Sequence, residues 1–126
     1  MRKKSLFLLI LLSILPWIRI SFGMDIYVLG NGHDAQSGSM IAPVRSIEGA
    51  YDLISNLAQV TYNIILKSDG GSIPIAKNNG NGFTWTKSGS ETHPINMYSL
   101  NDMAHIRRSS DGSYMITFRN VAYINY

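Results

Sequence analysis

The sequence predicts a single, mainly β domain with one helix, and three observations support this. Short segments rich in β-branched and aromatic residues recur along the chain after residue 24. Runs of Gly, Asn and Ser separate these segments, as is typical of turns. One stretch alone carries apolar residues at helical spacing. A small β-sandwich and a solenoid both satisfy this pattern, so the residues by themselves leave the two architectures open.

The segment from Met1 to Gly23 has the three-part build of a secretory signal peptide. A basic start at residues 2–4 precedes an apolar core at residues 6–15, and Gly23 offers a small residue for cleavage. The apolar core is shorter than the about 20 residues that cross a bilayer. We therefore expect residues 24–126 to be exported to the periplasm, the cell surface or the medium, and to meet the membrane only through the export signal.

The net charge of +3 belongs mostly to this leader. The chain has 11 Lys and Arg and 8 Asp and Glu, and Arg2, Lys3, Lys4 and Arg19 all precede Gly23, which leaves seven basic against eight acidic residues. A near-neutral domain lacks the basic patch of nucleic-acid binding, so we expect no nucleic-acid partner. The chain has no cysteine, so its apolar core must stabilise it without disulfides.

One helix is predicted, beginning at about Ser46 and ending at about Leu57. Ser46 can cap its first turn. Gly49 lowers the intrinsic helix propensity by about 1 kcal/mol relative to Ala, so burial must supply most of the stability. The apolar residues that share one face of this helix are Ile47, Ala50, Tyr51, Ile54 and Ala58.

Seven further segments have strand composition. They are residues 25–29, 62–67, 73–75, 95–98, 104–107, 114–118 and 122–126. Ile95 and Met97 alternate with Asn96 and Tyr98, which predicts one apolar and one polar face. The continuous apolar run at residues 64–66 predicts a strand that is covered on both faces.

Three stretches carry a resemblance to a known family. They read IYVLGNGHDAQSGSMIAPVRSIEGAYDLI (26–54), IILKSDGG (64–71) and SGSETHPINMYS (88–99). They resemble the N-terminal part of right-handed parallel β-helix proteins of the pectin-lyase-like class. The resemblance implies that residues 24–126 form the first rungs of such a β-helix, with the helix capping its N-terminal end. It also implies a β-helix that is incomplete at its C-terminal end, where an open edge favours strand-edge self-association.

The same resemblance implies a function in binding or cleaving polysaccharide, most of all acidic polysaccharide, by β-elimination. In this class the catalytic groups generally lie on later rungs, so no residue of this chain is assigned as catalytic. We expect this stretch to be structural and inactive alone. Calcium would enter only as a cofactor of a full-length relative. Two alternatives stay open: a non-catalytic, adhesin-like β-helix module and a small carbohydrate-binding β domain.

Few side chains stand out as site residues. Arg107 and Arg108, beside a predicted strand, are candidates for contact with an anionic sugar. The other cations available to such chemistry are Lys67, Lys87 and Arg119.

Metal binding finds little support in the sequence. The three histidines, His33, His93 and His105, are far apart and lack metal-ligand spacing. Asp34 could join a calcium site, yet one Asp among amides and serines is ordinary turn chemistry. We therefore assign no metal and no cofactor to this chain.

Overall fold

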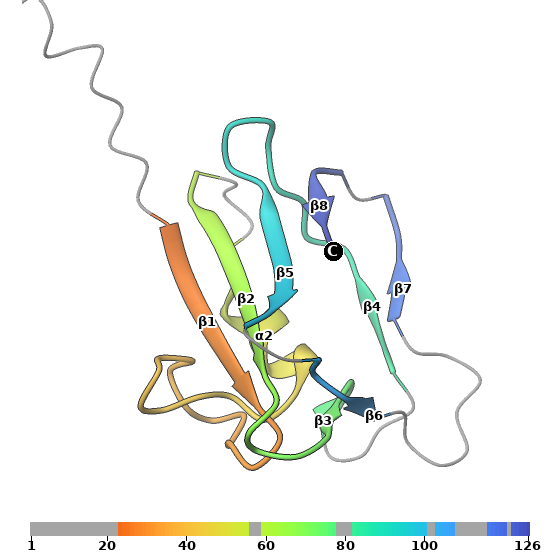
Figure 1. The fold of residues 1–126 in the computed structure, drawn as a ribbon. Coiled ribbons are helices and arrows are strands. Elements are labelled where there is room, and N and C mark those ends of the chain that lie inside the picture. Colours follow the sequence, from red (N-terminus) through yellow and green to blue (C-terminus); the bar gives the residue numbers. More distant parts are fainter. Residues whose placement is uncertain (1–22, 56–58, 78–81, 101–102, 108–115, 121) are drawn as a thin grey trace, which may run out of the picture.

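The computed structural model describes residues 23–55, 59–77, 82–100, 103–107, 116–120 and 122–126. These residues form a mainly β structure with one short helix, α2 (Ile47–Leu53) (Figure 1). The strands are β1 (Gly23–Leu29), β2 (Thr61–Lys67), β3 (Ile73–Pro74), β4 (Phe83–Trp85), β5 (Ile95–Ser99), β6 (Ile106–Arg107), β7 (Ile116–Phe118) and β8 (Ile124–Asn125).

The predicted signal peptide lies outside the described residues, except for its last residue. Gly23 is the first residue of β1 and pairs with Thr61 of β2. None of the helices in the described part of the chain is long and apolar enough to span a membrane.

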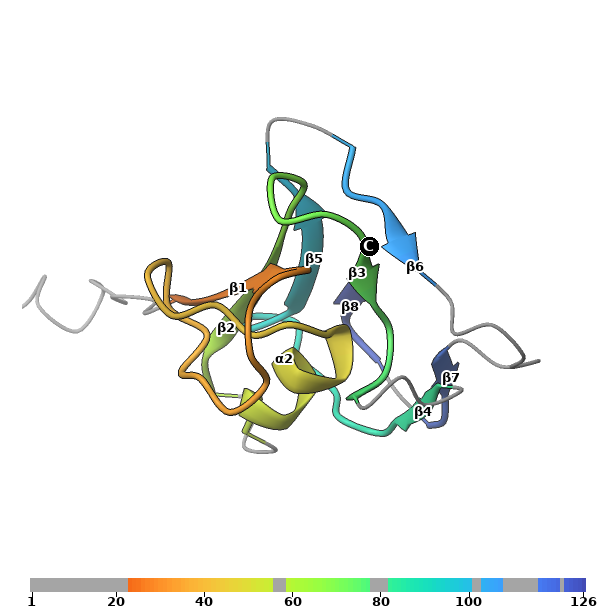
Figure 2. The same cartoon turned by 90° about the horizontal axis from the view of Figure 1, so that it is seen from below.

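The strands form three sheets, and all pairings between them are parallel. The largest sheet has the order β1-β2-β5-β8, and the two smaller sheets pair β3 with β6 and β4 with β7. Tyr62 lies opposite Ile95, Ile73 opposite Ile106 and Phe83 opposite Ile116, so these three pairings, one in each sheet, have the same offset along the chain. The chain therefore visits the three sheets twice in the same order, through β2, β3 and β4 and then through β5, β6 and β7 (Figure 2).

The core lies between the sheets and α2. Alternate residues of β1 and β2 point into it, as the two-residue period of a strand requires. Trp85 of β4 is the largest fully buried side chain, and its ring packs against Tyr51 of α2 with 5.0 Å between the centroids. The predicted burial of residues 64–66 on both faces is confirmed, because all three are buried.

The helix begins as predicted and ends early. Ser46 is its N-cap and accepts a hydrogen bond from the Gly49 amide at 2.9 Å. The predicted end at Leu57 is wrong, because the helix ends at Leu53 and Ile54 is extended. The Ser55 amide donates to the Tyr62 hydroxyl at 3.1 Å instead of continuing the helical ladder. Residues 56–58 lie outside the described part.

The predicted strands are all present, although several are shorter. The predicted segment 104–107 is a strand only at Ile106–Arg107, and 122–126 only at Ile124–Asn125. Residues 114–115 lie outside the described part. Sequence reasoning missed β4 entirely, because its three residues are too short to show alternation and its parallel partner, β7, is distant in the sequence.

Candidate functional site

The outward face of the four-stranded sheet is the candidate functional site. In β2, Tyr62, Ile64 and Leu66 belong to the core. Asn63 and Ile65 therefore point to the opposite face. The parallel register places side chains of the neighbouring strands beside them, so that two rows of side chains cross the sheet.

The first row is a ladder of hydrogen-bonded side chains, named here the amide ladder and made of Asp25, Asn63, Asn96 and Asn125. Asn63 Nδ2 donates to Asp25 Oδ1 at 2.8 Å, and Asn96 Nδ2 donates to Asn63 Oδ1 at 2.9 Å. Asn125 Nδ2 donates to Asn96 Oδ1 at 2.9 Å. All three links run in one direction, each donor bonding to the preceding strand.

The amide ladder keeps hydrogen-bonding capacity for a ligand. A side-chain amide has two N–H donors and two lone pairs on its oxygen. In Asn63 and Asn96 the ladder uses one donor and one lone pair each. Each amide therefore retains one donor and one acceptor. Sugar hydroxyls, which both donate and accept, match this pattern.

The second row consists of Tyr27, Ile65 and Tyr98, one residue from each of three adjacent strands, with an aromatic ring on either side of the isoleucine. Ile65 is only 3% exposed although it faces away from the core, and it lies between the two tyrosines in the register. Tyr98 is 43% exposed. Its ring offers a flat apolar surface with a polar hydroxyl at its tip, directly beside the amide ladder.

The charges on this face are few and do not favour either sign strongly. Asp25 is exposed at the start of the amide ladder. Lys67, at the end of β2, forms an ion pair with Asp69, with 3.5 Å between Nζ and Oδ2. This face therefore presents amide groups and rings to its surroundings more than charge.

The candidate anion-contacting residues are only partly placed. Arg107 lies in β6, but its side chain is outside the described part, as is the whole of Arg108. Of the other cations, Lys67 is paired with Asp69. Arg119 is exposed just after β7, where its amide donates to the Trp85 carbonyl at 3.0 Å.

Lys87 has a structural role at the end of α2. Its Nζ donates to the Tyr51 carbonyl at 2.6 Å and lies 4.2 Å from the centroid of the Tyr51 ring. Burial lowers the pKa of Lys87 below its usual value of 10.5; interaction with Tyr51 opposes this effect, and the nearby charge of Lys77 adds to it. Lys87 thus adds a second hydrogen bond to the Tyr51 carbonyl at the end of the helix, which also accepts from the Ile54 amide at 3.2 Å.

Asp34, weighed above as a calcium ligand, holds the start of α2. Its Oδ1 accepts hydrogen bonds from the amides of Arg45 at 2.9 Å and Ser46 at 2.8 Å, and from Ser46 Oγ at 2.9 Å. His33 accepts a hydrogen bond from the Ala35 amide through Nδ1. Across the residues that the structure describes, no three His, Asp or Glu side chains gather where they could hold a metal ion.

Sequence reasoning did not identify the amide ladder as a site. It predicted the alternation of the segment that forms β5 correctly, since Asn96 and Tyr98 do share a face. The signal that could have found the ladder is the recurrence of an Asn within an apolar strand, at Asn63 and again at Asn96. Comparison of the chain with protein-family models, curated proteins and solved structures found no match.

Proposed function

We propose that this chain forms the first coils of a right-handed parallel β-helix in an exported protein, with α2 as the N-terminal cap. The parallel pairing of β2 with β5, β3 with β6 and β4 with β7 at one shared offset supports this proposal. Crossovers between parallel strands are right-handed in about 98% of cases, which supports the handedness. The apolar face of α2 packs into the core beside β1, as expected of a cap.

The function that we propose for this part is polysaccharide binding on the outward face of the four-stranded sheet. The observation that carries it is the amide ladder beside the exposed Tyr98 ring. Adjacent strands are about 4.8 Å apart, so the ladder repeats its donors and acceptors at a spacing close to that of successive sugar units in a chain. The tyrosine ring suits the apolar face of a sugar ring.

Cleavage is not part of the proposed function of this stretch. β-Elimination needs a base and a neighbouring cation that neutralises the sugar carboxylate. Lys67 is paired with Asp69 and Lys87 is bonded to the Tyr51 carbonyl, and the amide ladder itself begins with the carboxylate of Asp25. The acidic polysaccharide implied by the resemblance therefore remains one arm of the binding test, with a neutral polysaccharide as the other.

The test is affinity electrophoresis of the purified chain in gels that contain polygalacturonate, alginate or neutral xylan. We expect retardation by at least one polysaccharide. Replacement of Tyr98 by Ala should weaken binding about tenfold, since an aromatic contact contributes up to about 1.5 kcal/mol. Ile41→Ala is the control, because the Ile41 side chain is 95% exposed in a loop outside the rows of the sheet.

Two results would count against the proposal. Migration that no polysaccharide alters would remove the binding function. Retention of full affinity in both Tyr98→Ala and Asn96→Ala would move the binding site away from this face. A third measurement follows the absorbance of unsaturated products, and a clear increase with pectate or alginate would contradict the absence of cleavage.

A further inference from the structure

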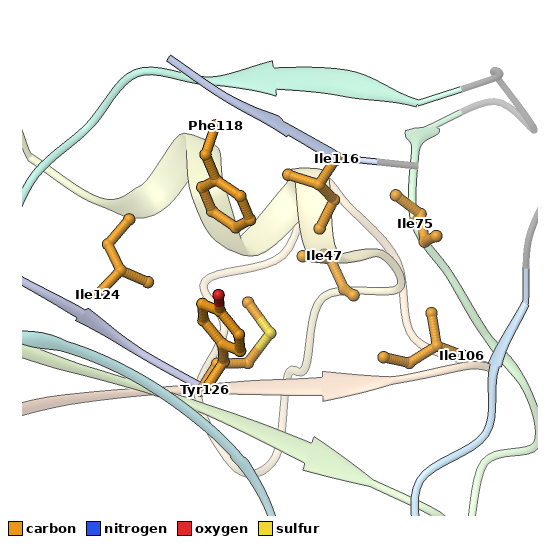
Figure 3. Close-up of a pocket in the computed structure, with 8 residues that line it drawn as sticks. Ile47, Ile75, Ile106, Ile116, Phe118, Ile124 and Tyr126 are labelled. Atoms are coloured by element: carbon orange, nitrogen blue, oxygen red, sulfur yellow. The ribbon is translucent and has the colours of Figure 1, made fainter. Parts of the chain in front are cut away.

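A polar cavity of about 380 Å³ lies in the loop that follows β1. Charged side chains line it, in contrast to the apolar cavity of Figure 3, around which Ile47, Phe118 and Tyr126 gather. The residues that line the polar cavity are Gly30, Asn31, Gly32, His33, Asp34 and Arg45. Its volume lies within the range of about 300–1,000 Å³ that is typical of cavities for small molecules.

The loop that carries these residues is held in place by close backbone packing. The Gly32 amide donates to the Leu29 carbonyl at 2.7 Å, and the His33 amide donates to the Pro43 carbonyl at 3.2 Å. A Cβ atom on Gly32 would lie 2.6 Å from the Pro43 carbonyl oxygen, so only glycine allows this approach. The polar cavity is therefore formed before a ligand binds, which lowers the cost of ordering the site.

Arg45 brings a cation to the polar cavity, and its side chain is half-buried there. Among the described residues, the ion pairs are Lys67 with Asp69 and Lys77 with Asp52. The Arg45 guanidinium belongs to neither of these pairs. Because a guanidinium can donate two parallel hydrogen bonds to one carboxylate, Arg45 suits a ligand with a carboxylate group.

Asp34 and His33 add an acceptor and a donor beside this cation. Asp34 Oδ1 accepts three hydrogen bonds at the start of α2, whereas Oδ2 accepts none from the described residues. His33 Nδ1 accepts from the Ala35 amide at 3.1 Å, so a neutral ring carries its proton on Nε2 and can donate from there. Asp34 and Arg45 thus line one cavity without pairing with each other.

These groups match a phosphate poorly. The Asp34 carboxylate would repel a multiply charged anion. The first amides of α2 are also occupied, because the Glu48 amide donates to the Ile75 carbonyl at 2.9 Å and the Gly49 amide donates to Ser46 Oγ at 2.9 Å. A ligand that satisfies both Arg45 and Asp34 needs one carboxylate and one hydrogen-bond donor.

We propose that the polar cavity binds a small carboxylate that carries a donor group, either ammonium or hydroxyl, on the carbon beside its carboxyl group. Arg45 holds the carboxylate, with His33 Nε2 as a second donor, and Asp34 Oδ2 accepts from the donor group. α-Amino acids and α-hydroxy acids share this chemistry. This site is separate from the amide ladder, so the proposal does not depend on polysaccharide binding.

The test is titration of the isotope-labelled chain with acetate, glycolate or glycine, followed by two-dimensional NMR of its amide signals. These ligands differ only in the group beside the carboxyl group, which is absent in acetate, hydroxyl in glycolate and ammonium in glycine. We expect glycolate or glycine to shift the signals of Gly32, His33 and Asp34. That ligand should bind at least about threefold more tightly than acetate, because it can donate to Asp34. The tighter of the two identifies the source as hydroxy acids or amino acids.

Two variants assign the binding to its side chains. Arg45→Gln should weaken binding about tenfold or more, because it removes the charge that holds the carboxylate. Its matched control is Arg119→Gln, since Arg119 is exposed after β7 and does not line the polar cavity. Asp34→Asn keeps an oxygen that can accept from Arg45 and Ser46 but replaces the other oxygen by a donor, so it should abolish the preference over acetate.

Three results would overturn the proposal. They are the absence of shifts at tens of millimolar ligand, equal binding of acetate, glycolate and glycine, and equal effects of Arg45→Gln and Arg119→Gln. The comparison of the three ligands uses the unmodified chain, so it decides the question even where a variant fails to fold. None of these results bears on polysaccharide binding at Tyr98.

Discussion

Replacement of Gly49 by Ala tests whether the start of α2 depends on Asp34. In a helix interior this substitution ordinarily stabilises by about 1 kcal/mol. Here a Cβ atom on Gly49 would lie 2.2 Å from Asp34 Oδ1, a separation at which the carboxylate has to move. Moving it weakens the bonds from Arg45 and Ser46, and hydrogen bonds to a charged group contribute about 1.5–3 kcal/mol each.

The sign of the effect follows from these magnitudes. Loss of two of the three bonds to Asp34 costs about 3 kcal/mol or more, and the gain in helix propensity returns about 1 kcal/mol. We expect Gly49→Ala to lower the free energy of unfolding by about 2–3 kcal/mol. Urea unfolding followed by circular dichroism measures the midpoint and slope from which this value is obtained.

A double-mutant cycle isolates the contact. In an Asp34→Ala background the carboxylate is gone, so Gly49→Ala should become neutral or stabilise by up to about 1 kcal/mol. The difference between the two backgrounds measures the coupling of the two residues. An equal stabilisation of both backgrounds by Gly49→Ala would refute the reasoning, because it would show that the Cβ atom does not displace Asp34.

Three further predictions concern the sheet and its supports. Asn96→Ala removes two links of the amide ladder and should cost about 1–2 kcal/mol in urea unfolding; an unchanged midpoint would show that the ladder contributes nothing. Trp85→Ala should cost about 3–5 kcal/mol, because Trp85 is fully buried, and a loss below about 1 kcal/mol would contradict its place in the core. Because the pKa of Lys87 is lowered in the folded chain, the unfolded chain binds more protons than the folded chain just below pH 10.5, and Lys87 makes the free energy of unfolding rise with pH there. In urea unfolding at several pH values, Lys87→Met should remove this rise, and an unchanged pH dependence would contradict the prediction.

Local features of the fold were predictable from the sequence where neighbouring residues decide them. Ser46 caps the helix through a bond to the nearby Gly49 amide, so its role is visible in the sequence. The end of the helix was not predictable, because Ser55 bonds to Tyr62 of β2 and Lys87 reaches back along the chain to the Tyr51 carbonyl. Apolar periodicity continues past the last helical residue, but these long-range bonds end the helix there.

In the candidate site too, local features were predictable from the sequence and long-range contacts were not. Alternation within β5 predicts that Asn96 and Tyr98 share a face, and they do. Alternation cannot reveal that Asn96 lies beside Asn63, because that depends on the register between strands. The role of Gly49 was likewise hidden: intrinsic propensity makes it a weakness of the helix, whereas the structure makes it the space that Asp34 occupies.

The connection that leads to β8 is shorter than the one before it, and it contains two residues in the left-handed conformation. Asn125 pairs with Asn96 and Asn96 with Asn63, yet the first of these pairs is closer along the chain than the second. Asn120 and Tyr123, with φ of 51° and 57°, lie in the shorter connection. This conformation suits Asn but costs a residue such as Tyr about 1–2 kcal/mol.

Tertiary contacts rather than repeat length therefore hold the register of β8. The cost at Tyr123 is offset because the Ile95 amide donates to the Tyr123 carbonyl at 3.1 Å and Asn125 completes the amide ladder. This connection places Asn125 on the proposed binding face. The proposed binding face thus depends on this connection, and a substitution that disfavours the left-handed conformation at Asn120 should weaken polysaccharide binding in affinity electrophoresis.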